Sequence, residues 1–310
     1  MVNSSASSFQ QRFIGSRVRA AREERRLTQQ ALSQTLGFKD RQSLSAIEQG
    51  IRAVSAEELM TLIQALGRDL DYFMDPFNVA GEAKFSWRVS REGLNVAATA
   101  ARTAPIFGLM RWLCQENLTI LKRSLRIDEA SSIDASHDAG NLLRRELKVG
   151  SFTSLQSLRL AIESKLGILV AFLELPRGFT GGLCRLSDCE ILVVNRRLAP
   201  DQQVIDLLGG LFYALTYDAL HPGVEMLSAN RATPGPKAER LCAGFVAGFL
   251  APSAIEGVAE RAFSLNVVER LRTALAEGNL SVRKAQKLLE FADLQTLKDL
   301  FALYGLEFDL

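Results

Sequence analysis

Residues 27–59, LTQQALSQTLGFKDRQSLSAIEQGIRAVSAEEL, decide the fold of the first part of this 310-residue chain. Thr28 is a good N-cap, because its hydroxyl can accept a hydrogen bond from a free N–H group in the first turn of a helix. Gly37 is typical of the position just past a helix, since glycine readily adopts the left-handed backbone conformation needed there. The stretch therefore predicts a short helix over residues 29–36.

A second short helix follows the turn that contains Gly37. Asp40 can cap it, and it runs from about Arg41 to Gln49 before Gly50 ends it. Two short helices joined by a glycine-containing turn are typical of a helix-turn-helix.

The flanking sequence completes a five-helix unit, which we assign to residues 11–78. A preceding helix has apolar residues at helical spacing, and Ser55 with Glu58 forms a capping box that opens the fourth helix. The polar stretch 1–10 is predicted to be disordered. The residues expected to face the core of the first and fourth helices are Ile14, Val18, Ala21, Leu59, Leu62, Ile63 and Leu66.

Positive charge is concentrated in this unit, although the whole chain carries a formal net charge of only +2. Residues 1–55 hold nine basic and four acidic residues, whereas residues 56–80 hold one basic and five acidic residues. A basic excess over the first three helices is where contacts to DNA phosphates would lie. The near-neutral total by itself does not point to nucleic acid.

Residues 13–76 resemble the XRE, or lambda-repressor-like, helix-turn-helix family. The resemblance rests on LTQ at 27–29, LG at 36–37 and SAIEQG at 45–50. It implies that the second motif helix enters the major groove, where all four base pairs can be distinguished. Because one such domain offers few phosphate contacts, a homodimer on a pseudo-palindromic double-stranded DNA operator is expected.

Three residues near the start of the second motif helix face outward and are candidates for base contact: Arg41, Gln42 and Ser45. Arg41 can read guanine with two hydrogen bonds, and Gln42 can read adenine in the same way. Glu48 is expected to stabilise the fold locally rather than to read a base.

The remaining candidates are expected to contact phosphate, which positions a protein on DNA without reading its sequence. The N-terminus of the first motif helix is favourable for an anion because of the helix dipole. The candidates in this class are Thr28, Gln29, Gln30, Lys39 and Arg52.

Residues 79–153 are predicted to be a connector and a helical region. An Asp-Pro pair and Gly81 place the domain boundary near residues 78–84. The apolar stripes of its helices are either core or a dimerisation face. The expected elements are a strand over 85–89 and helices over 94–126 and 134–148.

Residues 154–260 alternate between helices and strands and resemble the ImmA/IrrE-type metallopeptidase domain. The segments that carry the resemblance are LRLAIESKLGILVAFLELPRGFTGGLCRLSDCEILVVNRR, DQQVIDLLGGLFYALTYDAL and KAERLCAGFVAGFLAP. It implies a zincin-like α+β fold with a small sheet. The expected elements are helices over 155–166, 202–217 and 236–250 and strands over 168–173, 182–186 and 189–195.

The zinc-binding residues of that family are missing. A zinc helix needs histidines at i and i+4 as ligands and a glutamate at i+1 as general base. Leu208, Gly209 and Phe212 stand at those places, and residues 202–216 hold no His, Glu or Cys. Glu239 matches the third ligand, but one carboxylate does not hold zinc. We therefore expect a non-catalytic, peptidase-like domain, with no metal and no cofactor.

The chain has two histidines, His137 and His221, and both lie outside the expected zinc helix. Gly209 and Gly210 leave space where the metal would sit. That space is either packed by Phe212 or open as a ligand pocket.

Residues 261–310 are predicted to form a C-terminal helical subdomain. Ser281 can cap one helix, and a second helix carries apolar residues at helical spacing from Leu294 to Tyr304. Packing or oligomerisation through the apolar face is the favoured interpretation, and a second helix-turn-helix is the alternative.

The four cysteines form no CxxC pair, so neither a zinc ribbon nor a thioredoxin-type pair is available. Cys184 and Cys189 are expected to be packing thiols, and a reducing cytoplasm fits best. The polar N-terminus is unlike a signal peptide. The longest uncharged stretch, 241–255, is shorter than the roughly 20 residues that a membrane-spanning helix needs.

The sequence therefore predicts a mainly α chain with three parts: a helix-turn-helix domain, an α+β zincin-like domain and a helical tail. The expected function is a cytoplasmic, sequence-specific transcriptional regulator, a repressor by default. Its peptidase-like domain would sense a small-molecule or protein effector, or only dimerise. Two alternatives stay open: a zinc metallopeptidase that acts on a repressor, and an antitoxin-type interaction protein that autoregulates.

Overall fold

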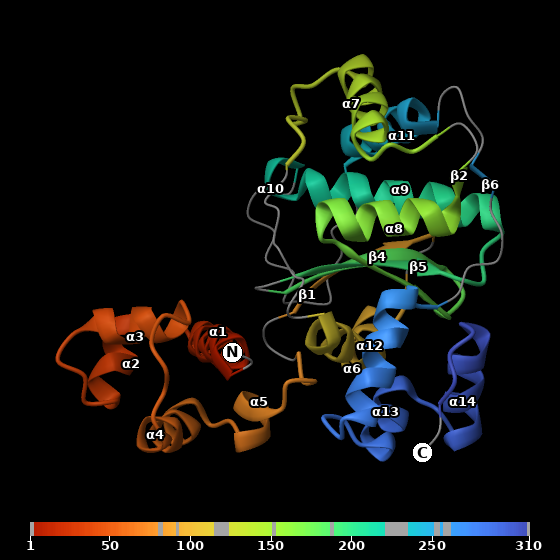
Figure 1. Ribbon diagram of the computed structural model, residues 1–310. Helices are drawn as coiled ribbons and strands as arrows, with labels where there is room; N and C mark the ends of the chain where they lie inside the picture. Colours follow the sequence, from red (N-terminus) through yellow and green to blue (C-terminus); the bar gives the residue numbers. More distant parts are fainter. Residues whose placement is uncertain are drawn as a thin grey trace. The chain divides into compact units, whose positions relative to one another are not determined.

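The computed structural model is mainly helical, with a small sheet in the middle of the chain (Figure 1). It divides into two compact units, one of Met1–Ala83 with Ala104–Glu116 and one of Lys84–Thr103 with Asn117–Leu310. None of the described helices combines the length and hydrophobicity needed to span a membrane. The structure describes residues 3–79, 83–90, 93–114, 124–150, 153–186, 189–220, 235–250, 255–256 and 262–308.

The first unit contains the five predicted helices, followed by the second half of a sixth. Helix α1 begins at Asn3, within the stretch 1–10 that the sequence was expected to leave disordered. No glycine or proline in residues 3–10 stops this helix from extending back. The helices are α1 (Asn3–Glu24), α2 (Gln29–Thr35), α3 (Arg41–Glu48), α4 (Ala56–Leu66), α5 (Leu70–Met74) and α6 (Val96–Cys114).

Helix α1 crosses α3 at a position where only glycine fits. A Cβ atom at Gly15 would lie 2.1 Å from the carbonyl oxygen of Ile47, which is a backbone atom that cannot move aside alone. The close approach brings the apolar faces of the helices together around one core. Its fully or almost fully buried members include Val18, Leu32, Leu44, Ile47, Leu62, Leu66 and Phe73.

Two buried arginines hold the chain that follows α5. Arg17 on α1 donates Nη1–H to the carbonyl of Tyr72 at 2.8 Å and Nη2–H to the carbonyl of Asn78. Arg111 on α6 donates to the carbonyl of Pro76 at 2.9 Å. Arg17 therefore satisfies a carbonyl in the last turn of α5, and both guanidinium groups bond carbonyls of the segment that follows this helix.

The second unit is built on a four-stranded sheet in the order β1-β4-β5-β3. β4 pairs antiparallel with both β1 and β5, whereas β3 pairs parallel with β5. Cys184 pairs with Ile191 in this register, and the thiols of Cys184 and Cys189 are both buried. The strands are β1 (Lys84–Val89), β3 (Leu169–Leu173), β4 (Phe179–Arg185) and β5 (Glu190–Asn195).

Helices cover both faces of this sheet (Figure 1). α8 and α9 lie on one face with α7 and α11 beyond them, and the C-terminal helices lie on the other side. The bounds are α7 (Ile133–Glu146), α8 (Leu155–Leu166), α9 (Pro200–Leu215), α10 (Tyr217–Leu220), α11 (Pro236–Leu250), α12 (Leu265–Ala276), α13 (Val282–Leu289) and α14 (Leu294–Leu303).

Glycines allow α7 and α11 to pack backbone against backbone. A Cβ atom at Gly140 on α7 would lie 2.2 Å from the carbonyl oxygen of Phe245, and one at Gly248 on α11 would lie 1.9 Å from that of His137. α11 is therefore fixed against α7, and its opposite face is left for other contacts.

Three features differ from the sequence-based expectation: the extent of the helical region 94–126, the helix α12, and a short pair of strands. Of the region 94–126 that was predicted to be helical, α6 covers Val96–Cys114 and residues 124–126 are not helical, while residues 115–123 lie outside the described part of the chain. The helix α12 and the short parallel pair of β2 (Thr153–Ser154) with β6 (Ile255–Glu256) were not predicted. His221 and the turn predicted at residues 187–188 lie outside the described residues.

The crossing of α1 and α3 gives a test of the fold. Alanine in place of glycine inside a helix normally stabilises it by about 0.5–1 kcal/mol. We predict that Gly15→Ala instead destabilises the first unit by about 1–3 kcal/mol, because the added Cβ forces the two helices apart. Urea unfolding followed by circular dichroism measures this change, and Arg19→Ala on the exposed face of α1 is the control. A Gly15→Ala variant as stable as the control would contradict the packing described.

Candidate nucleic-acid interface

The two motif helices begin at capped and fixed positions. The Thr28 hydroxyl accepts a hydrogen bond from the N–H of Ala31 at 3.1 Å, as predicted for the start of α2. The carboxylate of Asp40 accepts from the N–H groups of Gln42 at 2.9 Å and Ser43 at 3.2 Å, which fixes the start of α3. Gly37 lies between them with φ of +70°, the left-handed conformation that ends α2.

Helix α3 has one buried face and one exposed face. Leu44 and Ile47 are completely buried in the core of the first unit. Arg41 and Gln42 are exposed, so the turn predicted to read bases is open to solvent. Ser45 is half-buried, and its hydroxyl accepts a hydrogen bond from the side chain of Gln49 at 2.9 Å.

A buried ion pair joins three helices behind this face. Arg22 on α1 donates to both carboxylate oxygens of Glu48 on α3, at 2.6 and 3.0 Å. Gln29 on α2 donates to the same carboxylate at 2.9 Å. Arg22 also donates to the carbonyl of Leu27 at 2.9 Å, just before α2. Glu48 thus has the local structural contacts that we expected of it.

The predicted phosphate contacts fall into two groups. Thr28, Gln30 and Lys39 have exposed side chains around the helix-turn-helix. Gln29 and Arg52 have side chains that are already bonded inside the unit. A contact from Gln29 to DNA would therefore have to be made while its side chain stays bonded to Glu48.

Arg52 connects the turn after α3 to α4. It donates to Glu58 at 2.6 and 3.2 Å, and its guanidinium lies 5.2 Å from the centre of the Phe38 ring. Glu58 also accepts from the N–H of Ser55 at 2.9 Å and so completes the predicted capping box. The hydrogen bond from Arg52 holds the pKa of Glu58 below its ordinary value of 4.5. Arg52 is thus paired with an ionised carboxylate and has less freedom to bind phosphate than Lys39.

Two basic residues have a structural role that the sequence pattern does not reveal. Arg17 and Arg22 were part of the positive excess, yet both are buried and bonded within the unit. No local sequence signal marks Arg22, because its carboxylate partner is 26 residues away. The positive charge that DNA would meet is therefore smaller than the sequence count suggests and includes the exposed Lys39 and Arg41.

In the second unit, the positions expected for a zinc motif have no metal-binding side chains. Leu208 and Phe212 are completely buried, and Phe212 packs against Phe245 with ring centres 5.4 Å apart. Glu239 is exposed on α11. No group of three or more His, Cys, Asp or Glu side chains among the described residues is arranged to hold a metal ion. The donor set in the described part of the unit does not fit zinc.

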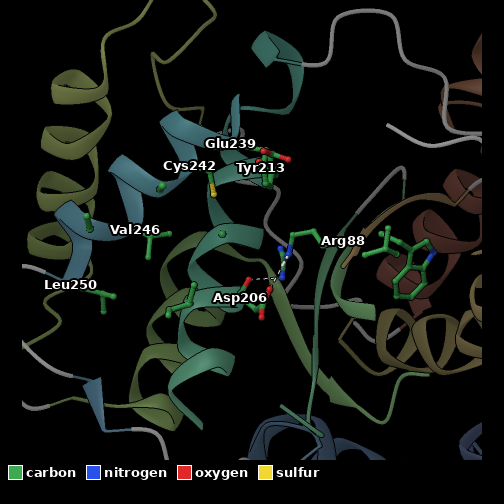
Figure 2. A pocket seen from close by; sticks show the side chains of 13 residues that line it. Arg88, Asp206, Tyr213, Glu239, Cys242, Val246 and Leu250 are labelled. Atoms are coloured by element: carbon green, nitrogen blue, oxygen red, sulfur yellow. Dashed lines mark hydrogen bonds and ion pairs between the residues drawn. The ribbon is translucent and has the colours of Figure 1, made fainter. Parts of the chain in front are cut away.

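A pocket of about 500 Å³ opens beside Gly209, between α9, α11 and the edge strand β1 (Figure 2). We call it the α9–α11 pocket. Phe212, which lies in the core, does not line it. The residues of α9 and α11 that line it are Ile205, Asp206, Gly209 and Tyr213, and Glu239, Cys242, Ala243, Val246, Ala247 and Leu250.

The second glycine of the pair accommodates an arginine. A Cβ atom at Gly210 would lie 2.6 Å from Nη1 of Arg88, and one at Gly181 on β4 would lie 2.5 Å from Nη2. Arg88 donates to the carbonyl of Asp206 at 2.5 Å, and its Nε lies 3.5 Å from the Asp206 carboxylate. Arg88 thus connects β1 to α9 at the wall of the pocket (Figure 2).

Comparison with known proteins identifies the first unit alone. Residues 18–73 match the model of the helix-turn-helix family, a stretch that runs from the last turns of α1 through α2, α3 and α4 into α5. This match supports a DNA-binding transcriptional regulator of the XRE type. No curated protein and no solved structure was found to match the chain.

The buried ion pair provides a test that does not need DNA. We predict that Glu48→Ala destabilises the first unit by about 3–5 kcal/mol, because it leaves the charge of Arg22 buried without its carboxylate. Glu23→Ala is the matched control, since Glu23 contacts Arg19 and Arg22 from a half-exposed position. It should cost less than about 1 kcal/mol. Chemical unfolding measures both variants. An equal loss in the free energy of unfolding would show that the buried pair contributes no more than the exposed one.

Proposed function

We propose that the protein is a sequence-specific transcriptional regulator of the XRE type, which binds a double-stranded DNA operator and represses by default. The observation that carries the proposal is the exposed first turn of α3. This turn presents Arg41 and Gln42 beside the exposed Lys39. Asp40 caps the start of the helix, and Glu48 holds its other end through the buried bond with Arg22. An α-helix held in this way fits the major groove.

The side chains of this turn suit different parts of DNA. Arg41 offers a planar pair of donors that matches O6 and N7 of guanine, and Gln42 offers the donor and acceptor that adenine requires. Lys39 carries a charge without such geometry and suits a phosphate. Thr28, Gln29, Gln30 and Arg52 lie around the same turn and are proposed as further phosphate contacts, with Ser45 at the edge of the base-reading set.

We further propose that two chains act together. Three α3 side chains read few base pairs, and a single unit neutralises few phosphates. A homodimer doubles both and matches a pseudo-palindromic operator whose half-sites are about one helical turn apart.

The second unit is proposed to be peptidase-like but not catalytic, with a sensory or oligomerisation role. The support for this is chemical. Leu208 and Phe212 have no group that binds a metal, Gly209 has no general base, and Glu239 is a single exposed carboxylate. A catalytic zinc ion is held by three protein ligands and activates a water molecule at its fourth position. These residues do not provide the three ligands.

Footprinting of the full chain on its own upstream DNA at moderate salt tests the main proposal. We expect a protected site with two related half-sites. Absence of sequence-specific protection there and in a genome-wide pull-down would overturn the proposal.

Two variants separate base reading from phosphate binding. Gln42→Ala should change which base is preferred at one position in each half-site, at a cost of about 1–3 kcal/mol for the preferred sequence. Lys39→Ala should weaken all sequences about equally and reduce the salt dependence of binding by about one phosphate contact per domain. A uniform loss in Gln42→Ala, or changed preference in Lys39→Ala, would contradict these roles.

Elemental analysis of the purified chain tests the claim that the second unit is not a zinc enzyme. We expect no stoichiometric zinc in protein prepared without chelators. One zinc per chain that is lost in Glu239→Ala, but kept in the exposed control Glu269→Ala, would establish the metallopeptidase alternative instead.

A further inference from the structure

The α9–α11 pocket is elongated along one face of α11. Its lining residues on that helix are spaced at three and four positions, from Glu239 through Cys242 and Val246 to Leu250. Residues with this spacing share one helix face. At a rise of 1.5 Å per residue, Glu239 and Leu250 are about 16 Å apart along the helix axis. The pocket therefore has two distinct ends.

One end of the pocket is largely apolar, and its charged residue, Asp206, is already paired with Arg88. Val246 and Leu250 line it from α11, and Ile205 from α9 is 42% exposed although it is a large hydrophobic side chain. The volume of about 500 Å³ is within the range of small-molecule sites. An apolar ligand body placed here would cover Ile205 and remove water from these walls.

The charged side chains that line the pocket are paired with each other except for one carboxylate, that of Glu239. Arg88 is paired with Asp206, and Asp206 also accepts from Gln202 at 3.1 Å. Burial raises the pKa of Tyr213, and it raises the pKa of the Cys242 thiol to about 11, so both groups stay neutral near pH 7. Among the described residues, none donates a hydrogen bond to the carboxylate of Glu239 or forms an ion pair with it, and its charge acts on the neighbouring Tyr213 (Figure 2).

We infer that the α9–α11 pocket binds a small amphipathic amine, with its apolar body along Val246 and Leu250 and its protonated nitrogen at Glu239. An amine gives Glu239 the partner that it lacks, whereas an organic acid would meet Glu239 with the same charge. Binding of the amine does not require that the helix-turn-helix of the first unit binds DNA. Its role as an effector rests on the sensory function proposed above.

Three probes with the same apolar body test the inference: 4-phenylbutylamine, 4-phenylbutanol and 4-phenylbutanoate. We expect calorimetry on the full chain at one ionic strength to give the order amine, alcohol, acid. Because Glu239 is exposed, the amine should bind only about three- to tenfold more tightly than the acid. Equal binding of the three probes, tighter binding of the acid, or no binding at millimolar concentration would overturn the inference.

Two pairs of variants locate the site. Glu239→Gln should remove the preference for the amine, and Glu269→Gln, which changes an exposed carboxylate on α12, should keep it. Ala243→Trp should fill the pocket and weaken all three probes by tenfold or more. Arg240→Trp, at an exposed neighbour on α11 outside the pocket, should not. Amine binding that survives unchanged in Ala243→Trp would place the site elsewhere.

Cys242 gives a readout in the unmodified chain. It is partly exposed, whereas Cys114, Cys184 and Cys189 are buried. At about pH 9, where more of this high-pKa thiol is ionised and an alkylamine is still protonated, the amine should slow alkylation of Cys242 by iodoacetamide, followed by mass spectrometry, and the acid at equal concentration should not. An alkylation rate that saturating amine leaves unchanged would contradict the inference even if the Trp variant fails to fold.

Footprinting of the same preparation separates this inference from the proposed function. Operator protection without amine binding overturns the pocket assignment alone. Amine binding without operator protection overturns the regulator alone. If both hold, a change in operator affinity of threefold or more with saturating amine is the expected sign of an effector, and an unchanged affinity would contradict that role.

Discussion

The first unit depends on the buried ion pair of Arg22 with Glu48. This carboxylate joins three helices, since it belongs to α3 and accepts hydrogen bonds from Arg22 on α1 and Gln29 on α2. Buried pairs contribute little net stability compared with apolar residues of the same size, so their value is in fixing geometry. The side chains at the start of α3 can only meet the edges of bases if the helix has one orientation. The ion pair of Arg22 with Glu48 therefore fixes the orientation of α3, on which the proposed contacts to bases depend.

Much of the first unit could be predicted because its signals are local. Thr28, Asp40 and Ser55 each cap a helix by bonding to a backbone N–H two or three residues away. The pairing of Arg22 with Glu48 could not be predicted in this way. Nor could the crossing of Gly15 over Ile47, because both join segments that are more than 20 residues apart. The candidate residues around the turn could be chosen from the motif. Which of them are free of internal bonds, as Gln29 is not, depends on those distant contacts.

In the second unit, the sequence predicted the main strands β1, β3, β4 and β5 and the helices α7, α8, α9 and α11, but not α12, the β2–β6 pair or the pocket. The space beside Gly209 and Gly210 could have been packed by Phe212 or left open. The structure gives the two glycines different neighbours: Gly209 lines the α9–α11 pocket, and Gly210 lies under Arg88. Arg88 is more than 100 residues away in the sequence. The backbone packing of α7 on α11 through Gly140 and Gly248 is equally distant in sequence.

The position of Arg88 bears on how such a domain could change over evolutionary time. Its guanidinium lies over Gly181 and Gly210 and is paired with Asp206, so a fixed positive charge is part of the wall of α9. A divalent cation on this face of α9 would be repelled by that charge and would compete with it for Asp206. Introducing histidines on α9 would therefore not be enough to create a zinc site. Arg88 would have to change as well, and with it the connection between the edge strand and the helix. A zinc site could therefore arise on α9 only if Arg88 and the metal-binding positions of the helix changed together.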